Sequence, residues 1–283
     1  MEWANFQTQV PGKWVLAGEH AVLRGAAAVA LPHPDLGLSL VFRAGDSAAS
    51  DLLHIDPLDG SEIIEGLLRT ILQDFDGSSP FGMLQVQSTI PVGAGLGSSA
   101  ALCVAVSQWV AAQYGLTQKQ VVAWATQLEH QFHGRSSGMD VAVISAREPI
   151  AFTISQGIRK MGVTRLPRFT FHDTGLRSRT VDCVTKVQAF REQQPTLGAK
   201  IDERMELASR WAMEGLAAYD DQDSRLGLTR IAHAMSHARD CFYSWDLVPA
   251  GVQALEESLL KQGARSVKLT GAGGGGMVVA LWD

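Results

Sequence analysis

Cysteines, aromatic residues and long apolar runs are all scarce in this chain of 283 residues. The three cysteines, Cys103, Cys183 and Cys241, are odd in number and far apart, which argues against a disulfide framework or a zinc site. We expect them to be small core residues. No apolar run approaches the ~20 residues that span a bilayer, and residues 1–10 lack the pattern of a signal peptide. The sequence therefore predicts a cytoplasmic protein that does not contact membranes.

Charge of one sign is not concentrated anywhere along the chain. The 24 Lys and Arg residues and 29 Asp and Glu residues give a net charge of -5, and they are scattered. A basic block interleaved with aromatic residues is missing, so we expect no nucleic-acid partner. Hydrophobic residues make up 46% of the chain, which at this length is enough for a large core. These values fit a single two-lobed enzyme.

Strand and helix patterns are mixed without a regular βαβ alternation, which favours an α+β fold over a doubly wound sheet. The expected strands are 7–17, 26–32, 37–43, 82–90, 149–154 and 166–172. The expected helices are 61–75, capped by Ser61, 98–114, 117–132, capped by Thr117, 180–194, 200–218, 224–242 and 249–262. Two last strands flank a glycine-rich turn in "SVKLTGAGGGGMVVALW". The segment "RKMGVTRLP" predicts a boundary between lobes at residues 1–160 and 161–283.

Glycine is concentrated in "TIPVGAGLGSSAALCVAV", residues 89–106. Gly93, Gly95 and Gly97 follow an expected strand and precede an expected helix, so the loop needs positive φ angles or close approach to bare backbone. Unpaired amides and the positive end of the helix dipole meet at such a place and form an anion site. Ser98 and Ser99 add hydroxyls that can cap the helix or reach a phosphate or Mg²⁺.

Three other interpretations of this loop compete. A Walker A loop fails, because no lysine occurs from residue 70 to residue 117. A Rossmann fingerprint on Gly95, Gly97 and Ala100 is weak, because the segment about 20 residues later has a helical pattern where a second strand and an acidic residue should follow. A glycine turn with two capping serines and no ligand stays open on this stretch alone.

Two further stretches favour a ligand. "VPGKWVLAGEHAVLRG", residues 10–25, sets Lys13, Glu19 and His20 around a second turn, and "KLTGAGGGGMVVAL", residues 268–281, is the other glycine-rich turn. In order and spacing these motifs resemble the three signatures of the GHMP superfamily of small-molecule kinases. Within it, "GEHAV", "KLTGAGGGG" and "LEHQFHGRSSGMD", residues 128–140, are most similar to the mevalonate kinase family.

The resemblance implies a two-lobed kinase fold, with an N-terminal lobe like the second domain of ribosomal protein S5 and a ferredoxin-like C-terminal lobe. It implies ATP bound between the lobes, Mg²⁺, and transfer of a phosphoryl group to the primary hydroxyl of mevalonate. The implied catalytic residues are Asp140 and Lys13. The implied ATP loop is Gly93, Ala94, Gly95, Gly97, Ser98, Ser99 and Ala100, the Mg²⁺ ligands are Glu129 with Ser98 or Ser99, and the acceptor-side residues are Glu19, His20, Thr174, Gly273 and Gly274.

Phosphoryl transfer needs neutralised phosphate charge and a positioned alcohol, so a metal carboxylate, a cation and a carboxylate near the hydroxyl are the expected groups. Glu129 lies beside an apolar helical stripe, at the edge of a buried face. Asp140 opens an apolar segment, where an unpaired acid is costly to bury and Lys13 would stabilise its charge. The alternative for Asp140 is the N-cap of a helix at 140–147, and for Glu129 a solvated helix face.

The acceptor is the least defined part of this prediction. Pro32, His33, Pro34 and Asp35 interrupt the strands expected on the acceptor side, and the chain is short for a mevalonate kinase. Another GHMP kinase acting on a sugar, on phosphomevalonate or on a related alcohol is one alternative. A catalytically silent nucleotide-binding relative is another. A homodimer stays open, as do Thr180 as a helix cap and Arg177 or Arg179 as anion-binding groups.

Overall fold

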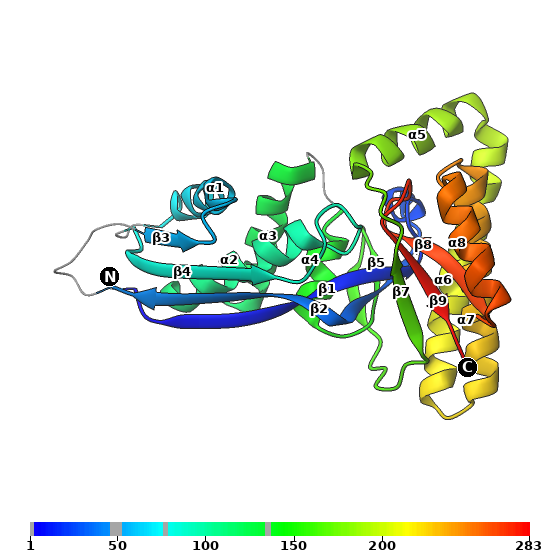
Figure 1. Ribbon diagram of the computed structural model, residues 1–283, viewed down its shortest axis with the longest axis horizontal. Coiled ribbons are helices and arrows are strands. Elements are labelled where there is room, and N and C mark those ends of the chain that lie inside the picture. Colours follow the sequence, from blue (N-terminus) through cyan, green and yellow to red (C-terminus); the bar gives the residue numbers. More distant parts are fainter. Residues whose placement is uncertain (1–2, 46–52, 76–78, 134–136) are drawn as a thin grey trace. The chain divides into compact units, whose positions relative to one another are not determined.

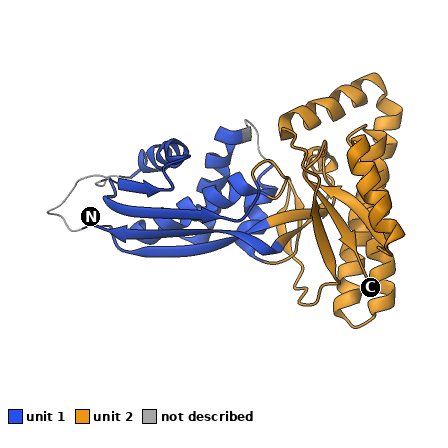
Figure 2. Cartoon of the chain, viewed as in Figure 1, with its two compact units in different colours: residues 1–12, 33–91, 97–147 blue, residues 13–32, 92–96, 148–283 orange. Residues whose placement is uncertain are grey.

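The computed structural model describes residues 3–45, 53–75, 79–133 and 137–283 (Figure 1). The chain forms two compact units, residues 1–12, 33–91 and 97–147 in the first and residues 13–32, 92–96 and 148–283 in the second (Figure 2). The two predicted lobes, 1–160 and 161–283, do not coincide with these units. The reason is that strands β1 (Phe6–Ala17) and β2 (Ala28–Ala44) each contribute residues to both.

The first unit joins a β-sheet to four helices. Strand β2 pairs antiparallel with β4 (Gly82–Ser88), and β4 pairs parallel with β3 (Leu53–Asp56). The helices are α1 (Ser61–Leu72), α2 (Ser98–Tyr114), α3 (Gln118–His133) and α4 (Met139–Ala146). Helix α2 packs against α1, α3 and α4 and buries residues around its whole circumference, as a central helix must.

Strand β2 is one continuous strand where the sequence predicts two, at 26–32 and 37–43. Its first part pairs with β5 (Ile150–Thr153) at Ala28–Ala30, and its last part pairs with β4 at Leu38–Ala44. Pro32 and Pro34 fall between these two registers. A proline cannot donate to a ladder, so it is tolerated where neither β4 nor β5 needs its N–H group.

The second unit contains a small sheet covered by helices. Strands β7 (Phe169–Asp173), β9 (Met277–Leu281) and β8 (Ser266–Thr270) form an antiparallel sheet in that order. Strand β5 also pairs with the short β6 (Gly157–Lys160). The helices are α5 (Thr180–Gln193), α6 (Pro195–Asp220), α7 (Ser224–Ser244) and α8 (Ala250–Lys261), and the 3-10 turn η1 spans Ala21–Arg24. Helix α7 packs on both α6 and β8.

The mixed α+β class and most expected elements are confirmed, and all three cysteines are buried core residues as predicted. Thr117 caps α3: its hydroxyl accepts from the Gln120 amide, and the Gln120 side chain accepts from the Thr117 amide. Two predicted caps are wrong, because Gly60 precedes α1 where Ser61 was expected and Arg179 precedes α5 where Thr180 was an alternative. Among the described residues, none of the helices combines the length and apolarity needed to cross a membrane.

Candidate active site

The predicted phosphate loop has an unusual backbone. Gly93, Gly95 and Gly97 have φ angles of 72°, 78° and 75°, while Ala94 and Leu96 between them do not share this positive φ. Alternation of this kind turns successive N–H groups to one side, which is the arrangement of an anion-binding nest. Within the described ranges, the N–H groups of these three glycines have no hydrogen-bond acceptor in the protein. The loop therefore fits a phosphate chain.

Two segments of the second unit hold the start of this loop. The Lys13 amide in β1 donates to the Leu96 carbonyl at 2.9 Å. A Cβ on Gly95 would lie 3.0 Å from the Thr270 carbonyl oxygen, and a Cβ on Gly276 would lie 2.6 Å from the Ala94 carbonyl oxygen. The two glycine-rich loops, which are far apart in sequence, therefore touch through bare backbone, and a side chain at either position would separate them.

The second glycine-rich turn, residues 271–276, is fixed by Thr174 and Ser178. The Thr174 amide and hydroxyl both donate to the Gly276 carbonyl at 2.9 Å, and the Ser178 hydroxyl donates to the Gly273 carbonyl. A Cβ on Gly274 would lie 2.8 Å from the Cβ of Ser178. The resemblance to GHMP kinases assigns three of these residues to the acceptor side. They are Thr174, Gly273 and Gly274, and hydrogen bonds hold Thr174 against the turn that contains the two glycines.

The first unit carries the predicted metal ligands on packed helices. Ser98 and Ser99 form the first turn of α2, after the N-cap Gly97, which supplies no side-chain cap. Glu129 in α3 is only 2% exposed, so its alternative as a solvated helix face is wrong. Burial, and next the charge of Glu129, raise the pKa of the Cys103 thiol in α2. Helices α2 and α3 pack together, and the carboxylate and the two hydroxyls that they carry are oxygen groups of the kind that Mg²⁺ prefers.

Asp140 occupies the first turn of α4, as its second residue. The N-cap is Gly138, with a φ of 80°, so the interpretation of Asp140 as an N-cap is wrong. The neighbouring Val141, Val143 and Ile144 are fully buried, while Asp140 itself is partly exposed. The helix therefore anchors this carboxylate through apolar neighbours and leaves it accessible.

Glu19 and His20 lie in the turn that follows β1 in the second unit, and both are buried. His20 adopts a φ of 61°, which is rare for a residue with a side chain. Its Nε2 lies 2.8 Å from the Ala272 carbonyl. Because a carbonyl only accepts, Nε2 carries the proton. Burial lowers the His20 pKa to about 4, so the ring is neutral at physiological pH.

The lowered His20 pKa predicts a loss of stability in acid. Between about 4 in the folded chain and 6.5 in the unfolded chain, only the unfolded state binds this proton, so stability falls as the pH falls through that window. From about pH 8 to about pH 5 the loss is about 2 kcal/mol. Urea unfolding of the native chain and of His20→Gln at both pH values measures it. An equal acid loss in the two proteins contradicts the assignment.

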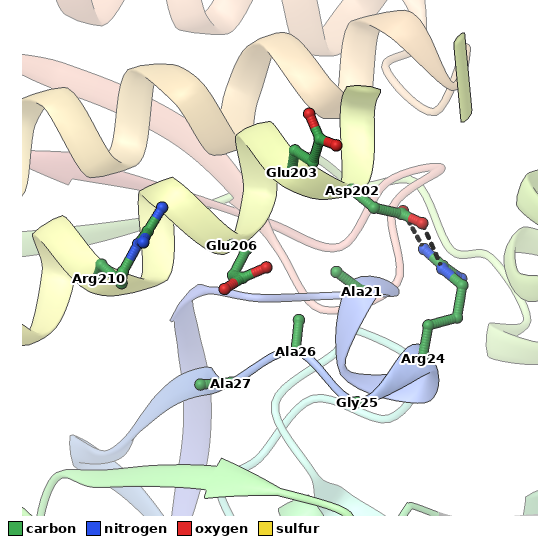
Figure 3. A pocket seen from close by; sticks show the side chains of 9 residues that line it. All are labelled: Ala21, Arg24, Gly25, Ala26, Ala27, Asp202, Glu203, Glu206 and Arg210. Atoms are coloured by element: carbon green, nitrogen blue, oxygen red, sulfur yellow. Dashed lines mark hydrogen bonds and ion pairs between the residues drawn. The ribbon is translucent and has the colours of Figure 1, made fainter. Parts of the chain in front are cut away.

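A cavity of about 360 Å³ lies between η1 and α6 (Figure 3). The Arg24 guanidinium pairs with both carboxylate oxygens of Asp202, which also accepts from Arg191 of α5. These three side chains are 19–24% exposed. Asp202 therefore joins three segments of the second unit and fixes η1, the turn that directly follows Glu19 and His20.

Asp202→Ala is expected to lower the free energy of unfolding by about 1–2 kcal/mol, because two arginines lose a partly buried carboxylate. The matched control is Asp240→Ala, whose pair with Arg204 is 3.7 Å long and about half exposed. That control should change stability by less than about 0.5 kcal/mol. Chemical denaturation of both variants makes the comparison, and equal losses contradict the role of Asp202.

The structure groups the predicted residues by unit. Ser98, Ser99, Glu129 and Asp140 lie on the packed helices α2, α3 and α4 of the first unit. The second unit brings together Lys13, Glu19, His20, Gly93, Ala94, Gly95, Thr174, Gly273 and Gly274. Sequence reasoning missed Lys268, which pairs with Glu19. The sequence feature that points to Lys268 is a charged residue inside the short apolar strand "SVKLT".

Comparison with known proteins agrees with this geometry. The N-terminal domain of the GHMP kinases matches residues 62–147. The mevalonate kinase of Aeropyrum pernix is 30% identical, over 98% of this chain and 88% of that protein, and the mevalonate kinase of Archaeoglobus fulgidus is 28% identical, over 96% and 90%. The crystal structure of L. major mevalonate kinase in complex with R-mevalonate superposes with a TM-score of 0.78 at 22% identity, covering 98% and 86% of the two chains.

The α+β fold and the glycine-rich loop at a helix N-terminus define a kinase of the GHMP class. Sequence identity across nearly the whole chain takes the assignment one step further. The chain belongs to the mevalonate kinase family.

Proposed function

We propose that this protein transfers the γ-phosphoryl group of ATP to the primary hydroxyl of mevalonate, giving 5-phosphomevalonate and ADP. The observation that carries the proposal is the loop of residues 93–99, which leads into α2. In this loop each second residue from 93 to 97 is a glycine with positive φ, and the residues between them do not have positive φ. A phosphate-binding loop of this kind suits a nucleotide triphosphate. The acceptor is proposed from the mevalonate kinases to which the chain is similar over nearly its whole length.

Asp140 and Lys13 are the proposed catalytic residues. Asp140 accepts the proton of the attacking hydroxyl, or balances charge beside it, from a position on the anchored first turn of α4. Lys13, 4% exposed in β1, supplies positive charge. Charge inside a protein is screened less than charge in water, so this lysine acts strongly on anionic groups that come near it.

The ATP loop is Gly93, Ala94, Gly95, Gly97, Ser98, Ser99 and Ala100 in this proposal. Glu129 with the hydroxyl of Ser98 or Ser99 would hold Mg²⁺, because a buried carboxylate and partly exposed hydroxyls are oxygen ligands of the kind this ion takes. When bound, the metal ion neutralises charge that develops on the phosphate oxygens. The chain's own contribution is to place amides, hydroxyls and one buried carboxylate before the substrate arrives.

The acceptor side is proposed to consist of Glu19, His20, Thr174, Gly273 and Gly274. Because His20 is neutral and its Nε2–H is bound to Ala272, the imidazole acts as a fixed polar surface. The Thr174 hydroxyl donates to Gly276, so Thr174 acts by shaping the glycine-rich turn. Rigid groups of this kind position an alcohol better than mobile ones.

The test is ADP release with Mg·ATP against a panel of acceptors: mevalonate, phosphomevalonate, homoserine, galactose and other sugars. Saturable turnover with mevalonate alone is the expected result. Turnover with another acceptor and none with mevalonate would keep a GHMP kinase but reject the proposed acceptor. A thermal shift with ATP, and no product from any acceptor, would indicate a nucleotide-binding relative without activity.

A further inference from the structure

A lysine with no role in the proposed chemistry lies fully inside the second unit. The Lys268 side chain in β8 is 1% exposed, although lysines are almost never fully buried unless they are paired. Its Nζ donates to Glu19 Oε1 and to the Val15 carbonyl, and it lies 5.4 Å from the centre of the Phe242 ring. One cation thus joins β8 to the end of β1 and to α7.

Glu19 depends on this lysine. Its side chain is 3% exposed, and among the described residues its Oε2 has no hydrogen-bond partner. Burial raises the pKa of this carboxyl, and the nearby Lys268 ammonium is the strongest influence that lowers it, with Lys13 in β1 acting from farther away. A buried carboxylate without a cation is unfavourable. Lys268 is therefore the cation that holds the Glu19 side chain in place.

The backbone that follows Glu19 reaches the second glycine-rich turn. His20 has the positive φ described above, donates to the Ala272 carbonyl, and packs against Trp245 with ring centres 5.2 Å apart. On β8, the Thr270 hydroxyl accepts from the Val15 amide at 2.8 Å. Lys268 and Thr270 thus fasten the end of β1 to the strand that leads into residues 271–276.

We propose that Lys268 is a positioning residue for the phosphoryl transfer proposed above. It holds Glu19, and through Glu19 the His20 turn, in register with the glycine-rich turn 271–276. The inference rests on the proposed function, since it assigns Glu19 and His20 to the acceptor. Burying an ion pair is a costly way to stabilise a core, because apolar residues of similar size often do as well or better. Because the Lys268–Glu19 pair is linked to the turn 271–276, we expect it to affect the geometry of the site as well as stability.

The first experiment measures steady-state kinetics of Lys268→Met with mevalonate and ATP. We expect kcat/KM for mevalonate to fall about 100-fold, because a displaced substrate-positioning group typically has an effect of this size. The KM for ATP should stay within about threefold of the native value, and Lys268→Arg, which keeps the charge, should recover most of the loss. Lys268→Gln is the second variant if Lys268→Met does not fold.

The control separates positioning from stability. Glu256 is fully buried and pairs with Arg239 and Tyr243 between α7 and α8. Glu256→Gln should destabilise the protein, because it breaks a buried ion pair, yet leave kcat/KM for mevalonate within about threefold of native. A loss in Glu256→Gln as large as that in the Lys268 variants overturns the proposal.

A second readout does not depend on activity. Hydrogen exchange of the amides of residues 17–21 and 271–276 should quicken in Lys268→Met and not in Glu256→Gln, because only the former removes the link between these segments. If exchange is faster in Lys268→Met but the native protein does not phosphorylate mevalonate, the proposed acceptor is rejected and the structural link between the two segments is retained. Unchanged exchange, or native kcat/KM in both Lys268→Met and Lys268→Gln, overturns the positioning role.

Discussion

Asp140→Asn is expected to lower kcat about 1,000-fold, within the range that general bases contribute. The asparagine has the same shape, so α4 should begin at the same residue, but it can neither accept the hydroxyl proton nor supply negative charge. The KM for ATP should stay within about threefold, because Asp140 lies outside the loop of residues 93–99. Steady-state kinetics with Mg·ATP and mevalonate measures both constants.

The matched control is Asp221→Asn, which removes an exposed carboxylate just after α6. That variant should keep native kcat. Circular dichroism and urea unfolding should show that both variants are folded, since the apolar residues that anchor α4 are untouched. Full turnover by a folded Asp140→Asn protein would remove Asp140 from the mechanism.

Gly95→Ala is expected to raise the KM for ATP about tenfold or more. An alanine at a φ of 78° costs about 1–2 kcal/mol, and tenfold in affinity corresponds to about 1.4 kcal/mol. Its Cβ would also lie 3.0 Å from the Thr270 carbonyl oxygen and 3.3 Å from the Gly271 Cα, both backbone atoms that cannot rotate away. The loop must shift, and its amides then leave the positions that suit phosphate.

Gly115→Ala provides the comparison with equal backbone strain. Gly115 ends α2 with a φ of 66°, and a Cβ there would meet nothing within 4 Å. We expect a loss of stability of about 1 kcal/mol and a native KM for ATP. If Gly95→Ala binds ATP as well as Gly115→Ala does, the loop is not the nucleotide site.

Local sequence patterns predicted most helices because their signals are local. Helix α3 begins where Thr117 and Gln120 form a reciprocal cap, and α2 ends at Gly115 in the left-handed conformation. Strand β2 was harder, because Pro32 and Pro34 are typical of a break. They are accommodated between two pairing registers, and that accommodation depends on β4 and β5, which are far away in sequence.

The parts of the candidate site that consist of one short sequence motif could be predicted from the sequence. Gly93, Gly95 and Gly97 are the residue type that adopts positive φ without strain, and a run of them before a helix indicated the loop that the structure shows. Lys268 was not predictable in the same way, because its partner Glu19 is 249 residues away and only the folded sheet brings them together. The two compact units were missed for the same reason, since β1 and β2 pass through both.

Transfer of the phosphoryl group from ATP to mevalonate is tested most directly by identifying the product. The protein is incubated with Mg·ATP and mevalonate, and the product is analysed by mass spectrometry and phosphorus NMR. We expect one phosphate monoester on the primary hydroxyl and an equal amount of ADP. ADP formed without a phosphorylated mevalonate, or no ADP above the level without acceptor, would contradict it.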